Sequence, residues 1–148
     1  MLLSTKILSK LLPEAHIYTC DLPTDDPHYK RYALRKGQED FFNNNLDAKN
    51  ITYNEMNSFF LLDKFKNKKF DFIWLDGGHT YPAVAWDTMY AYGAIKDGGV
   101  ILMHDYNRPG TNVKELMDSL EVFIPEELKL IPFAKYDQSS NVVWLRKE

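Results

Sequence analysis

The chain has 148 residues, 45% of them hydrophobic and 14% aromatic, as expected for one globular domain with a real core. Its net charge of −3 creates no field that would attract nucleic acid or an anionic membrane, and no segment resembles a membrane span. The single cysteine excludes an internal disulfide and a multi-cysteine zinc site. No secretory signal is recognisable, so a reducing cytoplasm is the expected compartment.

Helical and strand patterns alternate along the first part of the chain. Apolar residues recur at helical spacing near the N-terminus until Pro13, which ends that pattern. The predicted elements, in order, are a helix at 2–12, a strand ending at Asp21, a helix at 29–44, a strand at 50–56 and a short helix at 58–66.

The alternation continues in the second part. Residues 70–76 are apolar nearly throughout, which favours a strand buried on both faces of a parallel sheet. Thr80 is a plausible N-cap, and Pro82 lies near the first turn of the next helix. The remaining elements are that helix to about Lys96, a strand at 98–106, a helix at 113–120 and two strands at 128–133 and 141–147 that form an antiparallel hairpin.

Strands that alternate with helices imply an α/β fold with a mostly parallel sheet, here in one domain over residues 1–148. In such sheets ligands bind beyond the carboxyl ends of the strands. Polar residues stand at each of these strand ends in this chain, and the candidates for a site are Asp21, Asn57, Ser58, Asp76, His79, His104 and Asp105.

Asp21 ends the first predicted strand. A carboxylate at this place commonly accepts hydrogen bonds from the two hydroxyls of a ribose. The alternative is a local role in capping the turn that follows. Position alone gives the two interpretations equal weight.

Asp76, His104 and Asp105 are candidate ligands of a divalent cation. His104 follows Asp76 by 28 positions, which places them on adjacent parallel strands with one crossover helix between. Oxygen ligands from neighbouring strand ends suit Mg²⁺ or Mn²⁺, and a histidine among them shifts the preference toward Mn²⁺, Fe²⁺, Co²⁺ or Zn²⁺. The alternative makes Asp105 a turn cap and His104 a hydrogen-bonded core residue.

His79 lies three residues after Asp76, at the entry of a predicted helix. The positive end of the helix dipole disfavours the imidazolium there, and a neutral imidazole can act as a general base near pH 7. A histidine at a helix start is, however, more often a capping or packing residue.

The segments "DFIWLDGGHTYPAVAWD" and "AYGAIKDGGVILMHDY" together resemble the second half of a class I S-adenosylmethionine-dependent methyltransferase. The pattern runs Asp-Gly-x-His-x-Tyr, a helix, Gly-Gly and then His-Asp-Tyr. It begins at Asp76 and ends at Tyr106. The resemblance covers nearly the whole chain from Ser4 and implies a Rossmann-like methyltransferase sheet.

This resemblance implies roles for the candidate residues. Asp21 would hold the ribose of S-adenosylmethionine, Asn57 and Ser58 would lie beside the adenine, and Asp76 would face the cofactor. Metal-dependent O-methyltransferases of the catechol and antibiotic-sugar kind suggest a metal on Asp76, His104 and Asp105 and a base at His79, with His104 in place of the usual Asp, Asn or Glu. The implied reaction is direct methyl transfer to a small hydroxylated molecule such as a sugar.

One part of the family pattern is missing from this chain. The first strand and its glycine-rich loop should precede the first helix, yet the first glycine is Gly37. We therefore expect an N-terminally incomplete domain, a strand supplied by another copy, or direct pairing of the strands that end at Asp21 and Asp76. The second possibility would make the protein a homo-oligomer.

Three other functions compete with methyl transfer. A non-catalytic domain that keeps the fold for binding or assembly is favoured by the missing glycine loop and opposed by the complete set of strand-end residues. A metal-dependent hydroxylase or hydrolase could use the same ligands. A nicotinamide-dependent dehydrogenase is least favoured, because the Gly-x-Gly-x-x-Gly fingerprint is absent.

Overall fold

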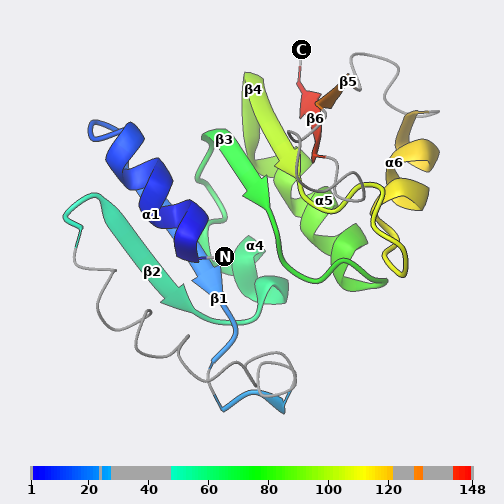
Figure 1. Ribbon diagram of the computed structural model, residues 1–148. Coiled ribbons are helices and arrows are strands. Elements are labelled where there is room, and N and C mark those ends of the chain that lie inside the picture. Colours follow the sequence, from blue (N-terminus) through cyan, green and yellow to red (C-terminus); the bar gives the residue numbers. More distant parts are fainter. Residues whose placement is uncertain (1, 24, 28–47, 122–128, 132–141, 148) are drawn as a thin grey trace. The chain divides into compact units, whose positions relative to one another are not determined.

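The computed structural model describes residues 2–23, 25–27, 48–121, 129–131 and 142–147 (Figure 1). The chain divides into two compact units, Met1–Phe60 and Leu61–Glu148, and each is described here by itself. The helix predicted at 29–44 lies outside the described residues. A single functional domain over 1–148 stays a prediction.

The first unit contains a helix and a two-stranded parallel sheet. In this sheet the residue pairs run in register from Ile17 opposite Ile51 to Asp21 opposite Glu55. The helix packs on the sheet through a buried hydrogen bond of 3.2 Å between the hydroxyls of Thr5 and Thr19. The elements are α1 (Leu2–Leu11), β1 (Ile17–Asp21), β2 (Ile51–Glu55) and the 3₁₀ helix η1 (Ser58–Phe60).

The side chain of Asn50 fastens the end of α1 to the start of β2. Its Oδ1 accepts a hydrogen bond of 2.6 Å from the Ser9 hydroxyl, and its Nδ2 donates to the carbonyls of Ser9, Leu12 and Ala15. The last carbonyls of a helix lack partners within the helix, so one amide side chain here satisfies several of them at once.

The second unit is built on a four-stranded mixed sheet in the order β3-β4-β6-β5. β3 and β4 are parallel, while β4 with β6 and β6 with β5 are antiparallel, so the predicted C-terminal hairpin is confirmed. The elements are α4 (Leu61–Lys64), β3 (Phe70–Leu75), α5 (Ala83–Ala94), β4 (Ile95–Met103), α6 (Val113–Glu121), β5 (Lys129–Ile131) and β6 (Val142–Arg146).

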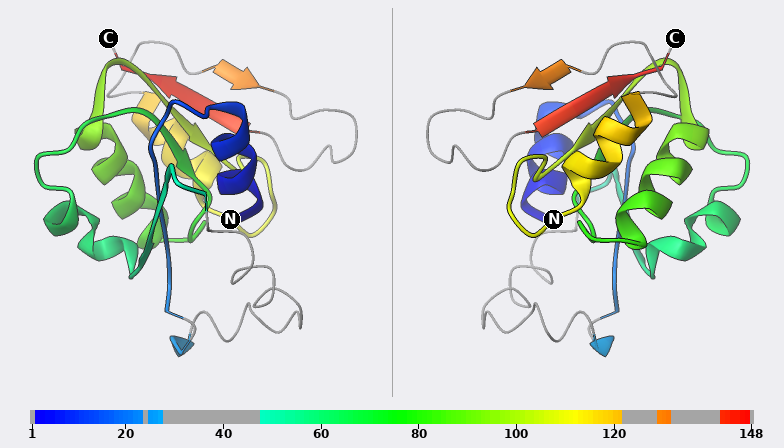
Figure 2. Two further views of the ribbon diagram at one scale, coloured as in Figure 1. Left: turned by 90° about the vertical axis from the view of Figure 1, so that its left-hand side faces the viewer. Right: turned by 90° about the vertical axis from the view of Figure 1, so that its right-hand side faces the viewer.

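The core of the second unit lies where α5 and α6 pack with β4 and β6 (Figure 2). Its fully buried members include Ile95, Ile101, Met117, Val113 and Val143. This core fixes β4 and α5, and these two elements position the ends of the parallel strands. None of the described helices combines the length and the apolar character needed to cross a membrane.

The strand over 70–75 differs from its prediction in burial. It is parallel to β4, as predicted, but Asp71 and Phe72 are exposed and none of its residues is fully buried. Within the second unit β3 is the end strand of the sheet, and among the described residues of that unit only β4 is hydrogen-bonded to it. β1 pairs with β2 within the first unit, and the predicted alternative of direct pairing between β1 and β3, which belong to different units, stays a prediction.

The boundary between α5 and β4 also differs from its prediction. The helix ends at Ala94, and the strand begins at Ile95 rather than at residue 98. The pairing with β3 then jumps from Ile95 to Val100, so the glycine pair forms an irregularity inside the strand. Gly98 has a φ of +76°, a conformation that glycine adopts without strain. At the other end of α5 the N-cap is Pro82 instead of Thr80.

Candidate active site

The ends of β3 and β4 bring the predicted residues of the second unit together. Leu75 is the register partner of Met103, so the residues that follow them, Asp76 and His104, start side by side. The N–H of His104 donates a hydrogen bond of 3.0 Å to the carbonyl of Leu75, which extends the pairing by one residue. The predicted arrangement of adjacent parallel strands with one crossover helix is confirmed.

A compact loop carries His79 back toward these strand ends. Close packing requires glycine at position 78, because a Cβ there would lie 2.9 Å from the Cβ of Ala83. A Cβ on Gly77 would lie 3.1 Å from a carboxylate oxygen of Asp87, a tight contact that a small shift of that side chain relieves. The loop is also held by the residue that precedes α6, since the N–H of Asn112 donates to the His79 carbonyl at 2.8 Å.

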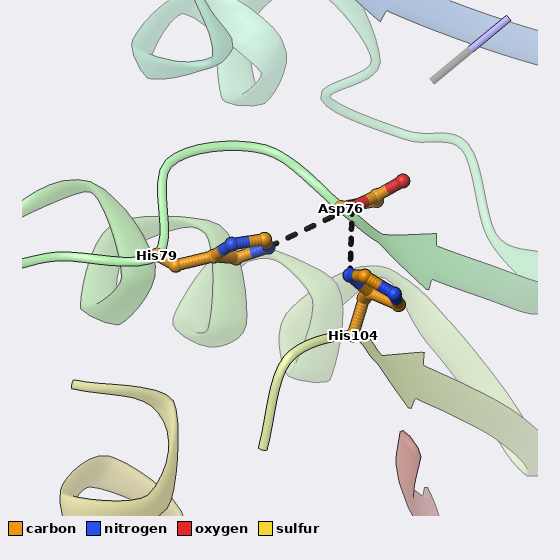
Figure 3. A group of neighbouring side chains, drawn as sticks. All are labelled: Asp76, His79 and His104. Carbon is orange, nitrogen blue, oxygen red and sulfur yellow. Dashed lines mark ion pairs between the residues drawn. The ribbon is translucent and has the colours of Figure 1, made fainter. Parts of the chain in front are cut away.

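Asp76, His79 and His104 form one cluster of side chains (Figure 3). Asp76 Oδ1 lies 3.7 Å from His79 Nε2 and 3.3 Å from His104 Nδ1. One potential ligand atom from each residue lies within 4.8 Å of the other two. The side chains of Asp76 and His79 are only 22% and 18% exposed, so the cluster is partly shielded from water.

Asp105 lies behind this cluster and contacts both histidines. Its Oδ2 is 3.0 Å from His79 Nδ1 and 2.7 Å from the Arg108 guanidinium, and its Oδ1 is 3.0 Å from His104 Nδ1. The residue is 1% exposed and has a φ of +62°. Asp is among the few residues that tolerate this left-handed conformation. Asp105 is therefore a buried junction of charged contacts.

The cluster shifts the pKa values of Asp76 and His104 apart. Burial opposes the ionisation of Asp76, but the contact with His104 and its charge outweigh this effect and lower the pKa of Asp76. The pKa of His104 is raised, chiefly by the contact with the Asp76 carboxylate, although burial acts in the opposite direction. The pair therefore favours its charged form.

His79 behaves differently from His104. Burial lowers its pKa, and the nearby carboxylates of Asp105 and Asp76 only partly offset this. A neutral imidazole has one N–H, and the Asp105 contact favours that proton on Nδ1. Nε2, which is buried and makes no hydrogen bond within the described part of the chain, then carries the free lone pair. This is the arrangement of a general base.

Three of the four predicted cofactor residues, Asp21, Asn57 and Ser58, lie in the first unit, where Asp21 and Asn57 each accept a local hydrogen bond. Asp21 ends β1, and its Oδ1 accepts a hydrogen bond of 2.9 Å from the N–H of Leu22. Asn57 Oδ1 accepts from the N–H of Phe59 at 3.0 Å and so opens η1, the first residue of which is Ser58. Turn capping by Asp21 is thus present; its role toward a ribose stays a prediction.

Asn112 is a positioning residue that the sequence prediction did not include. Besides its contact with His79, its Oδ1 accepts from the N–H of Tyr81 at 3.2 Å, and its Nδ2 donates to Glu115 at 2.9 Å. An Asn three residues before a Glu at a helix start is a capping-box pattern, and this could have marked the position. The contact with the histidine loop is not readable from that pattern.

Comparison with known families identifies the chain. A family model described as "Methyltransferase domain" matches residues 3–106, well over half of the chain. The chain belongs to this methyltransferase family. The match ends at Tyr106, directly after His104 and Asp105, so the cluster at the strand ends lies inside the region shared with the family. No curated protein matches the sequence.

Solved structures show the same fold at low sequence identity. The MycE methyltransferase from the mycinamycin biosynthetic pathway, in complex with Mg and SAH, is 17% identical with a TM-score of 0.57 over 97% of this chain and 40% of that one. A precorrin-6y C5,15-methyltransferase from Geobacter metallireducens is 17% identical with a TM-score of 0.57 over 97% and 73%. CalS11, a TDP-rhamnose 3'-O-methyltransferase, is 12% identical with a TM-score of 0.58 over 98% and 65%.

This chain therefore spans less than half the length of MycE and about two thirds of CalS11. The similarity establishes a class I methyltransferase fold for the chain. Because the matched proteins include both an O-methyltransferase and a precorrin methyltransferase, the fold alone does not identify the methyl acceptor.

Proposed function

We propose that the chain catalyses methyl transfer from S-adenosylmethionine to the hydroxyl of a small molecule, such as a sugar. The observation that carries this proposal is the pairing of His79 with Asp105, which leaves a neutral Nε2 directed toward Asp76 at the strand ends. Ligands of α/β sheets bind at these carboxyl ends, so the acceptor hydroxyl and the base would meet there.

In the proposed reaction His79 Nε2 takes the proton of the acceptor hydroxyl. The oxygen then forms a bond to the methyl carbon while the bond from that carbon to sulfur breaks, and S-adenosylhomocysteine leaves as a neutral thioether. Asp105 holds the other ring nitrogen of His79 at 3.0 Å and stabilises the imidazolium that forms. Alignment of the hydroxyl with the methyl group supplies much of the remaining acceleration.

The cofactor roles in this proposal are those that the family resemblance implies. Asp21 would accept hydrogen bonds from the ribose hydroxyls, and Asn57 and Ser58 would lie beside the adenine. Asp76 would face the sulfonium end, where its lowered pKa keeps it ionised. A carboxylate near a sulfonium is favourable because the cofactor carries a positive charge there.

The family resemblance also implies a divalent ion, Mg²⁺ or Mn²⁺, bound by Asp76, His104 and Asp105. Such an ion would lower the pKa of a bound hydroxyl. The donors fit Mg²⁺ poorly, because Mg²⁺ prefers oxygen ligands and this set contains an imidazole. Asp105 is moreover engaged through both oxygens by His79, His104 and Arg108. Of the two expected ions, the transition ion Mn²⁺ fits these residues better.

The proposal is tested with radiolabelled S-adenosylmethionine and a panel of sugars, nucleotide sugars and catechols. We expect transfer to at least one acceptor, and we expect His79→Ala to lower kcat by roughly 10²–10⁴-fold while binding of S-adenosylhomocysteine is unchanged. Thr80→Ala, at the exposed neighbouring position, is the matched control and should keep full activity. An unchanged rate in His79→Ala would exclude the base, and absence of cofactor binding would exclude the methyltransferase function.

A further inference from the structure

We infer that Asp76, His79 and His104 form a binding site for a divalent transition ion of the Zn²⁺, Co²⁺ or Fe²⁺ type in preference to Mg²⁺, with Asp105 as a supporting carboxylate behind His79. This inference uses the same place as the proposed function but does not depend on methyl transfer. It exchanges one residue of the ligand set that the family resemblance implies, because His79 takes the place of Asp105.

The first argument is the spacing of the ligand atoms. Ligands about 2.1 Å from a common ion lie about 3.0 Å apart at right angles and about 3.4 Å apart in a tetrahedron. The distances from Asp76 Oδ1 to His104 Nδ1 and His79 Nε2 are 3.3 and 3.7 Å. One potential ligand atom of each residue lies within 4.8 Å of the other two, and both histidine rings extend toward Asp76 (Figure 3).

The second argument is the state of the two ring nitrogens that face Asp76. His79 Nε2 is buried and makes no hydrogen bond within the described residues, whereas the buried Nδ1 of His104 lies between two carboxylates, 3.3 Å from Asp76 Oδ1 and 3.0 Å from Asp105 Oδ1. Buried polar atoms are normally satisfied, so the Nε2 of His79 indicates a missing partner. A cation beside two carboxylates would also displace the proton of His104 Nδ1 and bind the lone pair that this frees. A single cation would satisfy both lone pairs and the carboxylate together.

The third argument is the support of His79 from behind. Histidine ligands usually donate their other ring N–H to a carboxylate, which fixes the tautomer and the ring orientation. Asp105 Oδ2 lies 3.0 Å from His79 Nδ1 and is itself fixed by Arg108 at 2.7 Å. Asp105 therefore has the contacts of a supporting residue, and it is not one of the three residues whose ligand atoms converge.

The donor chemistry then selects the ion. Two imidazoles and one carboxylate form a set typical of transition ions, whereas Mg²⁺ takes oxygen ligands and retains several waters. Because the ion and a proton compete for the lone pair of His79 Nε2, a loaded site has no free base. Under the proposed function, a tightly bound transition ion is thus expected to inhibit methyl transfer that depends on His79.

The test measures ion binding by the full chain after chelator treatment, without cofactor or acceptor. Titrations with Zn²⁺, Co²⁺ and Mg²⁺ are followed by calorimetry, and Co²⁺ is also followed by its visible absorption. We expect Zn²⁺ and Co²⁺ to bind at least tenfold more tightly than Mg²⁺, and a Co²⁺ spectrum typical of mixed nitrogen and oxygen ligands.

Variants assign the ligands. His79→Ala and His104→Ala should each weaken Zn²⁺ binding at least tenfold. Asp105→Asn should weaken it by roughly tenfold, because Asp105 orients His79. His104→Asp should shift the ion preference back toward Mg²⁺. His16→Ala, which removes an exposed histidine of the first unit, is the control and should change nothing. Circular dichroism verifies that each variant is folded.

Equal affinity for Mg²⁺ and Zn²⁺, or Zn²⁺ binding that survives His79→Ala, would overturn the inference. Loss of Zn²⁺ binding in His16→Ala would also overturn it, because it would indicate a surface site. A protein that binds Zn²⁺ as expected but transfers no methyl group would leave this inference intact and remove the proposed function instead.

Discussion

The two sheets of the chain end in polar residues that are held in different ways. At the end of β1, Asp21 accepts a hydrogen bond from the N–H of the next residue, and after β2, Asn57 accepts one from the N–H two residues on. At the ends of β3 and β4, Asp76, His79, His104 and Asp105 contact one another across more than 20 positions of sequence. Turn chemistry alone can produce the first arrangement, whereas the second requires a folded sheet that holds ionisable groups close together.

The largest difference between the two sheet ends should appear in stability. Asp105→Ala removes a buried carboxylate from three partners and places Ala at a φ of +62°. Breaking a buried charge network by removing one partner typically costs about 3–5 kcal/mol, so we expect a loss of roughly 3 kcal/mol in the free energy of unfolding, measured by urea denaturation. Asp105→Asn should lose less, because Asn tolerates the backbone conformation and still accepts a hydrogen bond.

The matched substitution in the first unit is Asp21→Ala. It removes the local hydrogen bond from Leu22, and one bond of this kind contributes about 1.5 kcal/mol, well below the loss expected at Asp105. Equal losses of stability at Asp21 and Asp105 would contradict the distinction between local and long-range contacts.

The same distinction explains which parts of the fold were predictable. Periodicity and turn residues located the described helices and strands, because those signals are local. The sequence spacing between Asp76 and His104 also placed them correctly on adjacent parallel strands, since one crossover helix fits between them. The edge position of β3 was not predictable, because an apolar run does not state how many neighbours its strand has.

The sequence predicted which residues gather at the ends of β3 and β4, but not which contacts each of them makes there. Asp76, His79, His104 and Asp105 were all expected at the strand ends, and the structure brings them together. The burial of Asp105 and its contacts with two histidines and Arg108 depend on a left-handed residue after β4, and no residue pattern announces that conformation. Asn112 was missed because its partners, His79 and Tyr81, lie more than 30 positions away.

A smaller effect is expected on cofactor binding. Asp21→Ala should weaken the binding of S-adenosylhomocysteine by roughly 10- to 100-fold, because a hydrogen bond to a charged group contributes about 1.5–3 kcal/mol. Calorimetry measures this change, and His79→Ala should leave the same affinity nearly unaltered. Asp25→Ala, an exposed position in the following loop, is the control. Unchanged affinity in Asp21→Ala would leave Asp21 with its turn-capping role alone.

The smallest effect concerns the surroundings of the cluster in the second unit. Tyr106 donates a hydrogen bond of 2.9 Å to Asp118 on α6, and Lys114 contacts the same carboxylate. Lys114 and then Tyr106 lower the pKa of Asp118 below its usual 3.8. A group whose pKa is lower in the folded than in the unfolded protein stabilises the fold at a pH above its unfolded pKa. This stabilisation is lost as the pH falls through the pKa of the folded state.

The contacts of ionised Asp118 with Lys114 and Tyr106 should therefore stabilise the protein at pH 6 and lose this effect below about pH 4. We expect Asp118→Asn to lower the melting temperature by roughly 1–3 °C at pH 6, and the difference from the unmodified chain to shrink as the pH falls below 4. Asp97→Asn, at an exposed carboxylate near Lys147, is a suitable comparison. If the Asp118→Asn difference stayed constant down to pH 3, the contact with Tyr106 would act through packing, and charge would contribute nothing measurable at this edge of the site.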